Sequence, residues 1–266
     1  MASSPRPRLA WATDIHLDHA DVEARQRFAR ALAASGAEAV ALTGDLAEAP
    51  TLTHFLDGLA EEVSLPIYFV LGNNDYYRGS IEGVRSVMRE RYGSGRVRWL
   101  HGGWERFGDR ALVGVDGWGD AQLGNVDETP IMISDFRLIE DLAWRDREAR
   151  RDHLRSLGEV EAAALRGPLS EALAASDEVV VLTHIPPFAE ACWYEGGTSH
   201  PDWQPWFTCH AVGKVLREAA RAHPHKRLEV LCGHTHGAGV AEVLTNLIVY
   251  TGGADYGTPE LQPGLR

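Results

Sequence analysis

Residues 8–16 read RLAWATDIH, and stretches of similar design follow at residues 37–45 (AEAVALTGD) and 66–75 (PIYFVLGNND). Each apolar run predicts a buried strand, at residues 8–13, 37–43 and 66–71. Helical patterns follow these strands at residues 21–34, 51–63 and 80–91. Three strand–helix units in succession require right-handed crossovers, so the sequence predicts an α/β fold in which helices cover a parallel sheet.

The pattern changes after Gly93 to closely spaced apolar runs at residues 97–100 and 110–115, separated by Gly102–Gly103 and Gly108. Such spacing is typical of antiparallel or edge strands and indicates the start of a second sheet. Alternation then resumes with a strand at residues 178–183 and a helix at residues 211–222. The remaining expected strands lie at residues 228–232, 240–243 and 247–251. We therefore expect a layered α/β architecture within a single domain, residues 1–266.

Residues 116–177 depart from the alternation and predict a helical insertion that caps the pocket. A glycine-rich loop with a tryptophan leads into two helical patterns, at residues 134–155 and 158–175. The second pattern is expected to break at Gly167–Pro168, because proline removes a helical hydrogen bond.

The composition of the 266-residue chain is that of a globular protein, with 44% apolar and 24% charged residues. The net charge of −12 disfavours nucleic acid and anionic membrane surfaces as partners, although a local basic patch would leave a nuclease possible. Three cysteines without Cys-x-x-Cys spacing and no apolar run of ~20 residues predict a cytoplasmic protein with packed thiols and no membrane span. The oligomeric state is open.

Polar residues of metal-binding type follow five of the expected strands. Taken singly, each is more typical of a turn, a helix cap or a surface histidine. Because ligands bind outside the carboxyl ends of strands in open α/β sheets, the five junctions should meet in one crevice. The residues concerned are Asp14, His16, Asp45, Asn73, His184, His234 and His236.

This set of nitrogen and oxygen donors suits manganese, iron or zinc, with manganese the metal we expect to serve in vitro. Seven ligands exceed the three protein ligands that are usual for one catalytic metal, so they predict a centre with two divalent ions. Two ions can activate water and stabilise an in-line displacement at phosphorus. The sequence therefore predicts phosphoester hydrolysis.

In this order and spacing, the residues resemble the motifs of the calcineurin-like metallophosphoesterase family, over about residues 8 to 256. The resemblance implies a β-sandwich flanked by helices and hydrolysis of a small phosphomonoester or phosphodiester by a metal-bridging hydroxide. It also implies that Asp14, His16 and His236 bind one metal. Asn73, His184 and His234 would bind the other, and Asp45 would bridge the two and share in catalysis.

One position departs from the family pattern, because Asn74 stands where the family usually has a histidine that contacts the phosphate and helps to protonate the leaving group. An amide can orient the phosphoryl group but cannot deliver a proton near neutral pH. Three interpretations stay open: an enzyme for activated esters, an impaired metal-loaded binding or scaffold protein, or a substrate-trapping variant. His19, His101 and His210 are candidate replacement acids, although structural roles are more typical of each.

The long stretch from His184 to Cys209 is expected to form a wall or lid of the site, or else a local core of its own. Its aromatic residues are Trp193, Tyr194, Trp203, Trp206 and Phe207. The candidate substrate contacts are Tyr76, Tyr77, Arg78, Trp193 and Tyr194.

Overall fold

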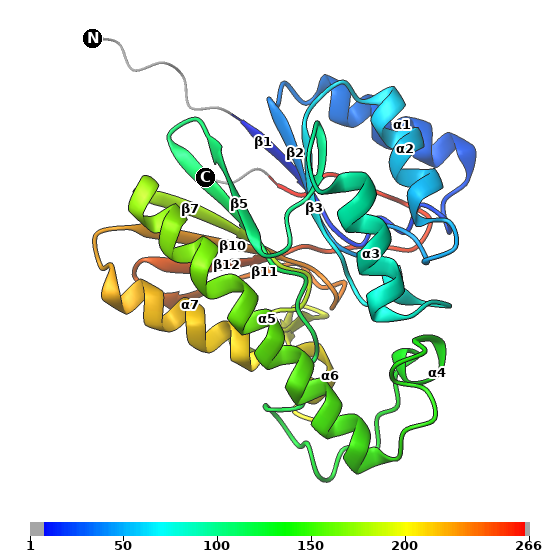
Figure 1. Ribbon diagram of the computed structural model, residues 1–266, viewed down its shortest axis with the longest axis vertical. Helices are drawn as coiled ribbons and strands as arrows, with labels where there is room; N and C mark the ends of the chain where they lie inside the picture. Colours follow the sequence, from blue (N-terminus) through cyan, green and yellow to red (C-terminus); the bar gives the residue numbers. More distant parts are fainter. Residues whose placement is uncertain (1–7, 264–266) are drawn as a thin grey trace.

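The computed structural model describes residues 8–263 and contains two large β-sheets and a small two-stranded one. The two large sheets pack face to face, and each is covered on its outer side by helices (Figure 1). The first sheet is parallel, with the strand order β1-β2-β3-β4. Its strands are β1 (Leu9–Ala12), β2 (Ala39–Thr43), β3 (Ile67–Val70) and β4 (Val97–Trp99). The helices beside it are α1 (Val22–Ala34), α2 (Leu52–Glu62) and α3 (Ile81–Tyr92).

The second sheet has six strands in the order β11-β12-β10-β7-β6-β5, with antiparallel pairing only at its two edges. Its strands are β5 (Gly103–Phe107), β6 (Arg110–Gly114), β7 (Glu178–Leu182), β10 (Arg227–Cys232), β11 (Gly239–Leu244) and β12 (Leu247–Thr251). Helices α5 (Arg147–Ala175) and α7 (His210–Ala222) lie across its outer face (Figure 1). The layers therefore run helix, sheet, sheet, helix, which confirms the expected layered α/β class.

Short segments complete the chain around the carboxyl ends of the strands. They are η1 (Asn74–Tyr76), α4 (Asp135–Leu138), η2 (Ala189–Ala191), β8 (Trp193–Tyr194), β9 (Gly197–Thr198) and α6 (Gln204–Phe207). Figure 1 places α4 and α6 beyond the same end of the sheets.

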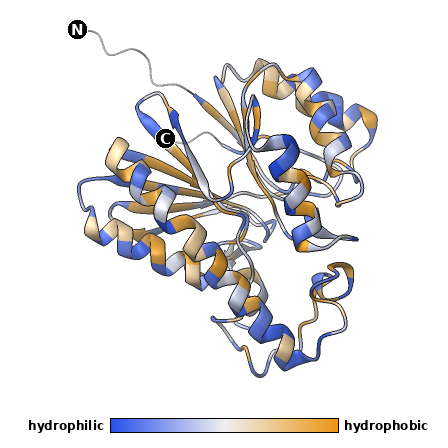
Figure 2. Ribbon diagram, viewed as in Figure 1, coloured by the Kyte–Doolittle hydropathy of each residue, from blue (hydrophilic) through white to orange (hydrophobic). Residues whose placement is uncertain are grey.

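The alternation of side chains along β1 shows how the layers are held together. Leu9 and Trp11 pack between the two sheets, whereas Ala10 and Ala12 face the helices of the first sheet. A third apolar layer lies between the second sheet and α5 and α7. Figure 2 shows apolar residues along the strands and polar residues on the outer sides of the helices. Both faces of each sheet are thus covered, as the continuous apolar runs require.

The helical region differs from its prediction in three ways. Residues 139–146 are not helical, and residues 147–175 form one helix instead of two. Pro168 lies inside α5 without ending it. The packing of Leu165 and Leu169 against the second sheet offsets the lost hydrogen bond, which costs about 3 kcal/mol. Residues 147–175 of the expected insertion therefore belong to the outer helical layer.

The second sheet also begins later than predicted. β4 pairs in parallel with β3 and so completes the first sheet, although its residues were expected to start the second. β5 includes Gly103, which the sequence indicated only as a break between two strands. It pairs with β6 in antiparallel orientation at the edge of the second sheet. The difference arises because a three-residue run carries too little pattern to indicate which sheet it joins.

Cys192, Cys209 and Cys232 are buried free thiols, and burial raises the pKa of Cys192 to about 11. Within residues 8–263, none of the helices combines the length and the apolar character needed to cross a bilayer.

Candidate metal centre

Five of the seven predicted ligands have a left-handed backbone conformation. The φ angles are 50° at Asp14, 37° at His16, 53° at Asp45, 71° at His234 and 58° at His236. Such angles cost about 1–3 kcal/mol for residues other than glycine and persist only where surrounding contacts enforce them. This strain is concentrated at the carboxyl ends of the strands, where turns bring the side chains into one crevice.

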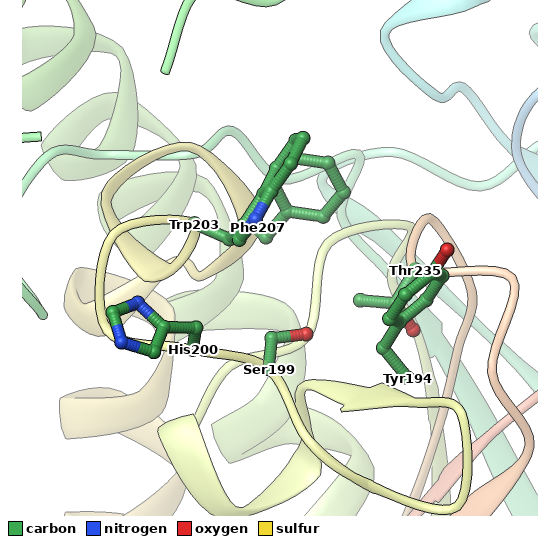
Figure 3. A pocket seen from close by; sticks show the side chains of 6 residues that line it. All are labelled: Tyr194, Ser199, His200, Trp203, Phe207 and Thr235. Atoms are coloured by element: carbon green, nitrogen blue, oxygen red, sulfur yellow. The ribbon is translucent and has the colours of Figure 1, made fainter. Parts of the chain in front are cut away.

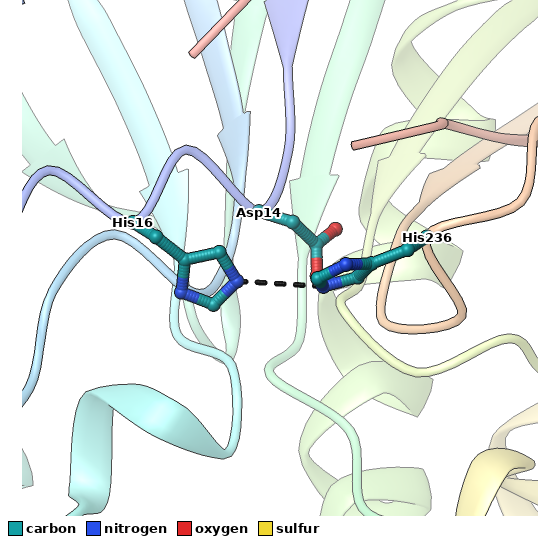
Figure 4. A group of neighbouring side chains, drawn as sticks. All are labelled: Asp14, His16 and His236. Carbon is teal, nitrogen blue, oxygen red and sulfur yellow. Dashed lines mark hydrogen bonds and ion pairs between the residues drawn. The ribbon is translucent and has the colours of Figure 1, made fainter. Parts of the chain in front are cut away.

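Asp14, His16 and His236 form one group whose potential ligand atoms all lie within 4.8 Å of one another (Figure 4). His236 Nε2 is 3.4 Å from Asp14 Oδ1 and 3.4 Å from His16 Nε2. The Asp14 carboxylate is held in place by the Thr13 hydroxyl, which donates at 2.7 Å, and by the backbone N–H of His234. The group is therefore preorganised by a contact between Asp14 and His234, which are 220 residues apart in the chain.

Asp45, His184 and His234 form a second group with the same spacing limit of 4.8 Å. Asp45 Oδ1 lies 3.4 Å from His184 Nε2, and Asp45 Oδ2 lies 3.9 Å from His16 Nε2. Asp45 is thus the carboxylate that lies near a histidine of each group.

Asn73 joins the second group through its amide oxygen, which lies 3.1 Å from His184 Nε2. Its amide nitrogen donates to Asp135 at 2.8 Å, so Asp135 determines which way the amide faces. The Tyr77 hydroxyl donates to the same carboxylate at 2.8 Å. Burial raises the pKa of Asp135 to about 6. Asp135 was not predicted as a functional residue, since nothing in the local sequence pattern relates it to Asn73.

Backbone carbonyls orient two of the histidines. The Thr43 carbonyl lies 2.8 Å from His184 Nδ1, and the Trp206 carbonyl lies 3.3 Å from His234 Nε2. A carbonyl accepts only, so we infer that these nitrogens carry the protons. His184 then offers Nε2 and His234 offers Nδ1 as ligand atoms, an arrangement typical of metal-binding histidines.

The electrostatics of the crevice favour a bound cation. Burial opposes ionisation of Asp45, but the charges of His184 and His16 outweigh it and hold the pKa of Asp45 well below its usual value. Burial acts to lower the pKa of His184, yet the carboxylates of Asp45 and Asp14 raise it to about 10. In residues 8–263, no lysine or arginine forms an ion pair with either aspartate. The donor set therefore fits divalent metal ions, whose positive charge would replace that of the protonated histidines beside the two aspartates.

Asn74 and Asp75 connect the turn after β3 to the turn after β2. The Asn74 backbone N–H donates to Asp45 Oδ1 at 2.8 Å, and the Asn74 side-chain amide contacts Asp45 Oδ2. Asp75 accepts from four backbone N–H groups, those of Gly72, Asp45, Leu46 and Ala47. Asp75 thus holds the Asp45 turn, a role that sequence reasoning did not assign.

Tyr76 and His101 lie in a buried ionic network beneath the crevice, so Tyr76 is turned away from the expected contact with substrate and His101 has the structural role that is more typical of such a residue. The Tyr76 hydroxyl donates to Asp116 at 2.9 Å, and His101 Nδ1 lies 3.3 Å from the same residue. Arg85 pairs with Asp116 at 3.0 Å and with Glu161 at 2.6 Å. Asp116 also accepts from the Leu71 backbone at the end of β3.

The other expected contacts and acids are divided between the crevice and the surface. Tyr77 lines the cavity of the centre, whereas the exposed Arg78 pairs with Glu48. Trp193 packs against Gly239 of β11, where a Cβ atom would lie 2.2 Å from the indole ring. His210 is the first residue of α7 and is not among the residues that line the cavity.

Tyr256 and His19 lie at the rim of the crevice. The Tyr256 ring lies 4.4 Å from the His16 ring and 5.1 Å from the His236 ring. The exposed His19 lies beside Tyr256, with ring centroids 5.1 Å apart. Tyr256 lines the cavity, whose volume is about 290 Å³. It was not predicted, because the C-terminal stretch around it carries no recognisable motif.

The long loop between β7 and α7 divides its aromatic residues between a local core and the cavity. Trp206 is buried, with its ring 5.1 Å from the Phe136 ring of α4. Trp203 and Phe207 line the cavity of the metal centre, whereas Tyr194 lines a neighbouring one. Both roles considered for this loop are therefore present in it.

A sandwich of two sheets with two adjoining aspartate–histidine groups at the strand ends is the architecture of a metal-dependent hydrolase. The chain belongs to the calcineurin-like phosphoesterase family, whose model matches residues 7–238. None of the curated proteins matches it in sequence.

Solved structures with the same fold include phosphopantetheinyl hydrolase from Mycobacterium tuberculosis, at 15% identity and a TM-score of 0.66, covering 95% of this chain and 90% of that chain. A dimetal phosphatase from Danio rerio is similar at 13% identity and a TM-score of 0.58, covering 94% and 88%. A protein from Thermus thermophilus is similar at 16% identity and a TM-score of 0.52, covering 95% and 91%.

Replacing Asp135 with leucine should weaken metal binding at the second group. Asp135→Leu removes the acceptor that orients the Asn73 amide, and loss of such an outer partner typically lowers metal affinity about 10–100-fold. Metal content after dialysis against buffered manganese measures the effect. Asp127→Leu, at an exposed position, is the control. Equal metal affinity in the two variants would show that Asn73 needs no such support.

Proposed function

We propose that this protein is a two-metal phosphoesterase that hydrolyses a small phosphomonoester or phosphodiester. The observation that carries the proposal is the position of Asp45, which is within 4 Å of His16 in one group and of His184 in the other. Membership of the calcineurin-like phosphoesterase family supports the same reaction class.

The proposed ligands are Asp14, His16 and His236 for one ion, Asn73, His184 and His234 for the other, and Asp45 for both. Manganese, iron and zinc all accept such mixed nitrogen and oxygen donors. When bound, two divalent ions supply activation of water and neutralisation of charge at phosphorus. The burial of Asp14 and Asp45 excludes competing water from the ligand oxygens.

The chain's own contribution to the reaction is to orient the phosphoryl group. Asn74 lines the cavity beside Asp45, and its amide can donate a hydrogen bond to a phosphoryl oxygen. Because an amide does not release a proton near neutral pH, the leaving group must depart without a proton from this residue. We therefore propose that esters of acidic alcohols, such as aryl esters, are the better substrates.

A second candidate function is a metal-loaded binding or scaffold protein, and Asn74 is the observation that favours it. A substrate-trapping variant would have the same chemistry at this position. The nuclease alternative is weaker, since neither lysine nor arginine lines the cavity within the described part of the chain.

Two measurements test the proposed function together. Metal analysis of protein reconstituted with manganese should return about two ions per chain, and the same protein should hydrolyse an aryl phosphomonoester or an aryl phosphodiester. Two ions without hydrolysis of either ester would support the binding protein. One ion or none would contradict the two-metal centre itself.

Tyr256 should contribute to phosphoryl binding through its hydroxyl. Tyr256→Phe keeps the ring that packs on His16 but removes the hydrogen-bond donor, so we expect KM for an aryl phosphate to rise about tenfold, as for a hydrogen bond to a charged group. Steady-state kinetics at constant metal concentration measures the change. Tyr68→Phe, which is outside the cavity, serves as the control. If both variants keep the original KM, Tyr256 does not contact the phosphate.

A further inference from the structure

A second cavity of about 370 Å³ adjoins the metal centre. We call it the aromatic pocket and define it by its lining residues Tyr194, Ser199, His200, Trp203, Phe207 and Thr235. Trp203 and Phe207 also line the cavity of the metal centre, so the two cavities share these walls. Figure 3 shows Tyr194 and Thr235 on one side and Trp203 and Phe207 on the other.

The pocket lies directly beside a proposed metal ligand. The Phe207 ring is 4.3 Å from the His234 ring, and the Trp203 and Phe207 rings meet edge to face at 5.3 Å. Thr235 lies in the chain between the ligands His234 and His236. The aromatic pocket therefore lies next to the place where we propose that the phosphoryl group binds.

Thr235 carries a hydrogen-bonding group without a partner in the protein. The residue is only 4% exposed, and its hydroxyl oxygen makes no hydrogen bond with any of the residues from 8 to 263. Buried hydroxyl groups are rarely left in this state, because they lose their bonds to water. The oxygen is also shielded from solvent in this conformation, so a ligand in the pocket restores the bond when the Thr235 side chain rotates toward it.

The charge of the pocket limits what can occupy it. Its lining contains no lysine, arginine, aspartate or glutamate, and His200 lies 3.4 Å from Asp202. A second phosphate or another charged group would lose its hydration there without a fixed partner. The aromatic walls instead favour a flat ring that can stack on them.

We propose that the aromatic pocket holds the organic group of the substrate, and that this group is a flat, uncharged ring carrying a hydrogen-bonding atom for Thr235. The inference rests on the proposed phosphoesterase function and adds the substrate class to it. The pocket volume of about 370 Å³ is within the usual range for small-molecule sites and accommodates one small ring system.

Kinetics of three phosphomonoesters tests the pocket in manganese-loaded protein. They are 4-methylumbelliferyl phosphate, which has a ring and a carbonyl, 1-naphthyl phosphate, which has only the ring, and 2,2,2-trifluoroethyl phosphate, which has neither. Trp203→Ala should raise KM for the two ring esters about tenfold more than KM for 2,2,2-trifluoroethyl phosphate, because base-like stacking is lost. Trp144→Ala, at a fully exposed position, should show no such difference. Equal changes for all three esters would overturn the proposal.

Thr235→Val separates the hydrogen bond from the stacking. We expect KM for 4-methylumbelliferyl phosphate to rise about fivefold more than KM for 1-naphthyl phosphate, because only the former can pair with the hydroxyl. Metal content is measured in parallel, since the residue lies between two proposed ligands. A rise of the same size for both esters, at full metal content, would refute the role of Thr235.

Binding of 4-methylumbelliferone itself distinguishes failure of the pocket from failure of the proposed function. Its fluorescence polarisation should report binding to the protein with and without chelator, weakened about tenfold by Trp203→Ala. Binding without hydrolysis of any ester would retain the pocket and contradict the phosphoesterase. The opposite result would contradict the pocket alone. In that case the protein hydrolyses the esters, but Trp203→Ala leaves its affinity for 4-methylumbelliferone unchanged.

Discussion

Replacement of Asp45 by asparagine is expected to remove at least one of the two metal ions and to lower phosphoesterase activity by more than about 100-fold. Loss of a residue that only orients a metal ligand typically lowers metal affinity or activity about 10–100-fold. We expect a larger effect here because Asp45 itself lies between the two groups. An asparagine keeps the size of the side chain but lacks its charge, so it cannot offset two adjacent cations.

Metal analysis and initial rates at saturating manganese measure this effect. Asp57→Asn is a matched control, since that aspartate is half exposed and pairs with Arg91 at the surface. Circular dichroism shows whether both variants fold. A folded Asp45→Asn protein that retains two ions and its original rate would refute the bridging role.

Restoration of a histidine at position 74 is expected to raise the rate for esters of poorly acidic alcohols by about 10²-fold or more. Positioned proton transfer contributes ~10²–10⁴ in rate, and an imidazole can supply a proton where the Asn74 amide cannot. The cavity of about 290 Å³ in front of Asn74 leaves space for the larger ring. Aryl esters should gain less, because their leaving groups need no proton.

The pH profile gives this variant a second readout. An imidazole acts as an acid only while protonated, so the gain in Asn74→His should diminish as pH rises above about 6.5. Asn125→His, at an exposed position, is the control. An unchanged rate in an active enzyme would show that Asn74 suits the native reaction, whereas two inactive forms would favour the binding protein.

The candidate ligands could be proposed from sequence because each one lies within four residues of the end of a strand with a clear apolar pattern. Parallel strands joined by right-handed crossovers place all their carboxyl ends at one edge, so linear order alone predicts convergence. The same local rule did not predict α5, where packing against the second sheet overrides the break expected at Pro168.

The residues that support the ligands required knowledge of contacts distant in sequence. Asp135 orients Asn73 from 62 positions away, and it follows no strand of either sheet. Tyr256 reaches His16 from the far end of the chain. Tyr76, which sequence order alone placed near the phosphate, instead points to Asp116, because the 3-10 turn η1 buries its side chain.

The amino-acid order by itself established the α/β class, the seven candidate ligands and the unusual Asn74, because strand periodicity and fixed crossover handedness are local rules. Folding in three dimensions determined which carboxylates orient the candidate ligands and where the aromatic pocket opens. These features depend on loops whose conformations are set by packing between segments far apart in the chain, and no local pattern encodes that packing.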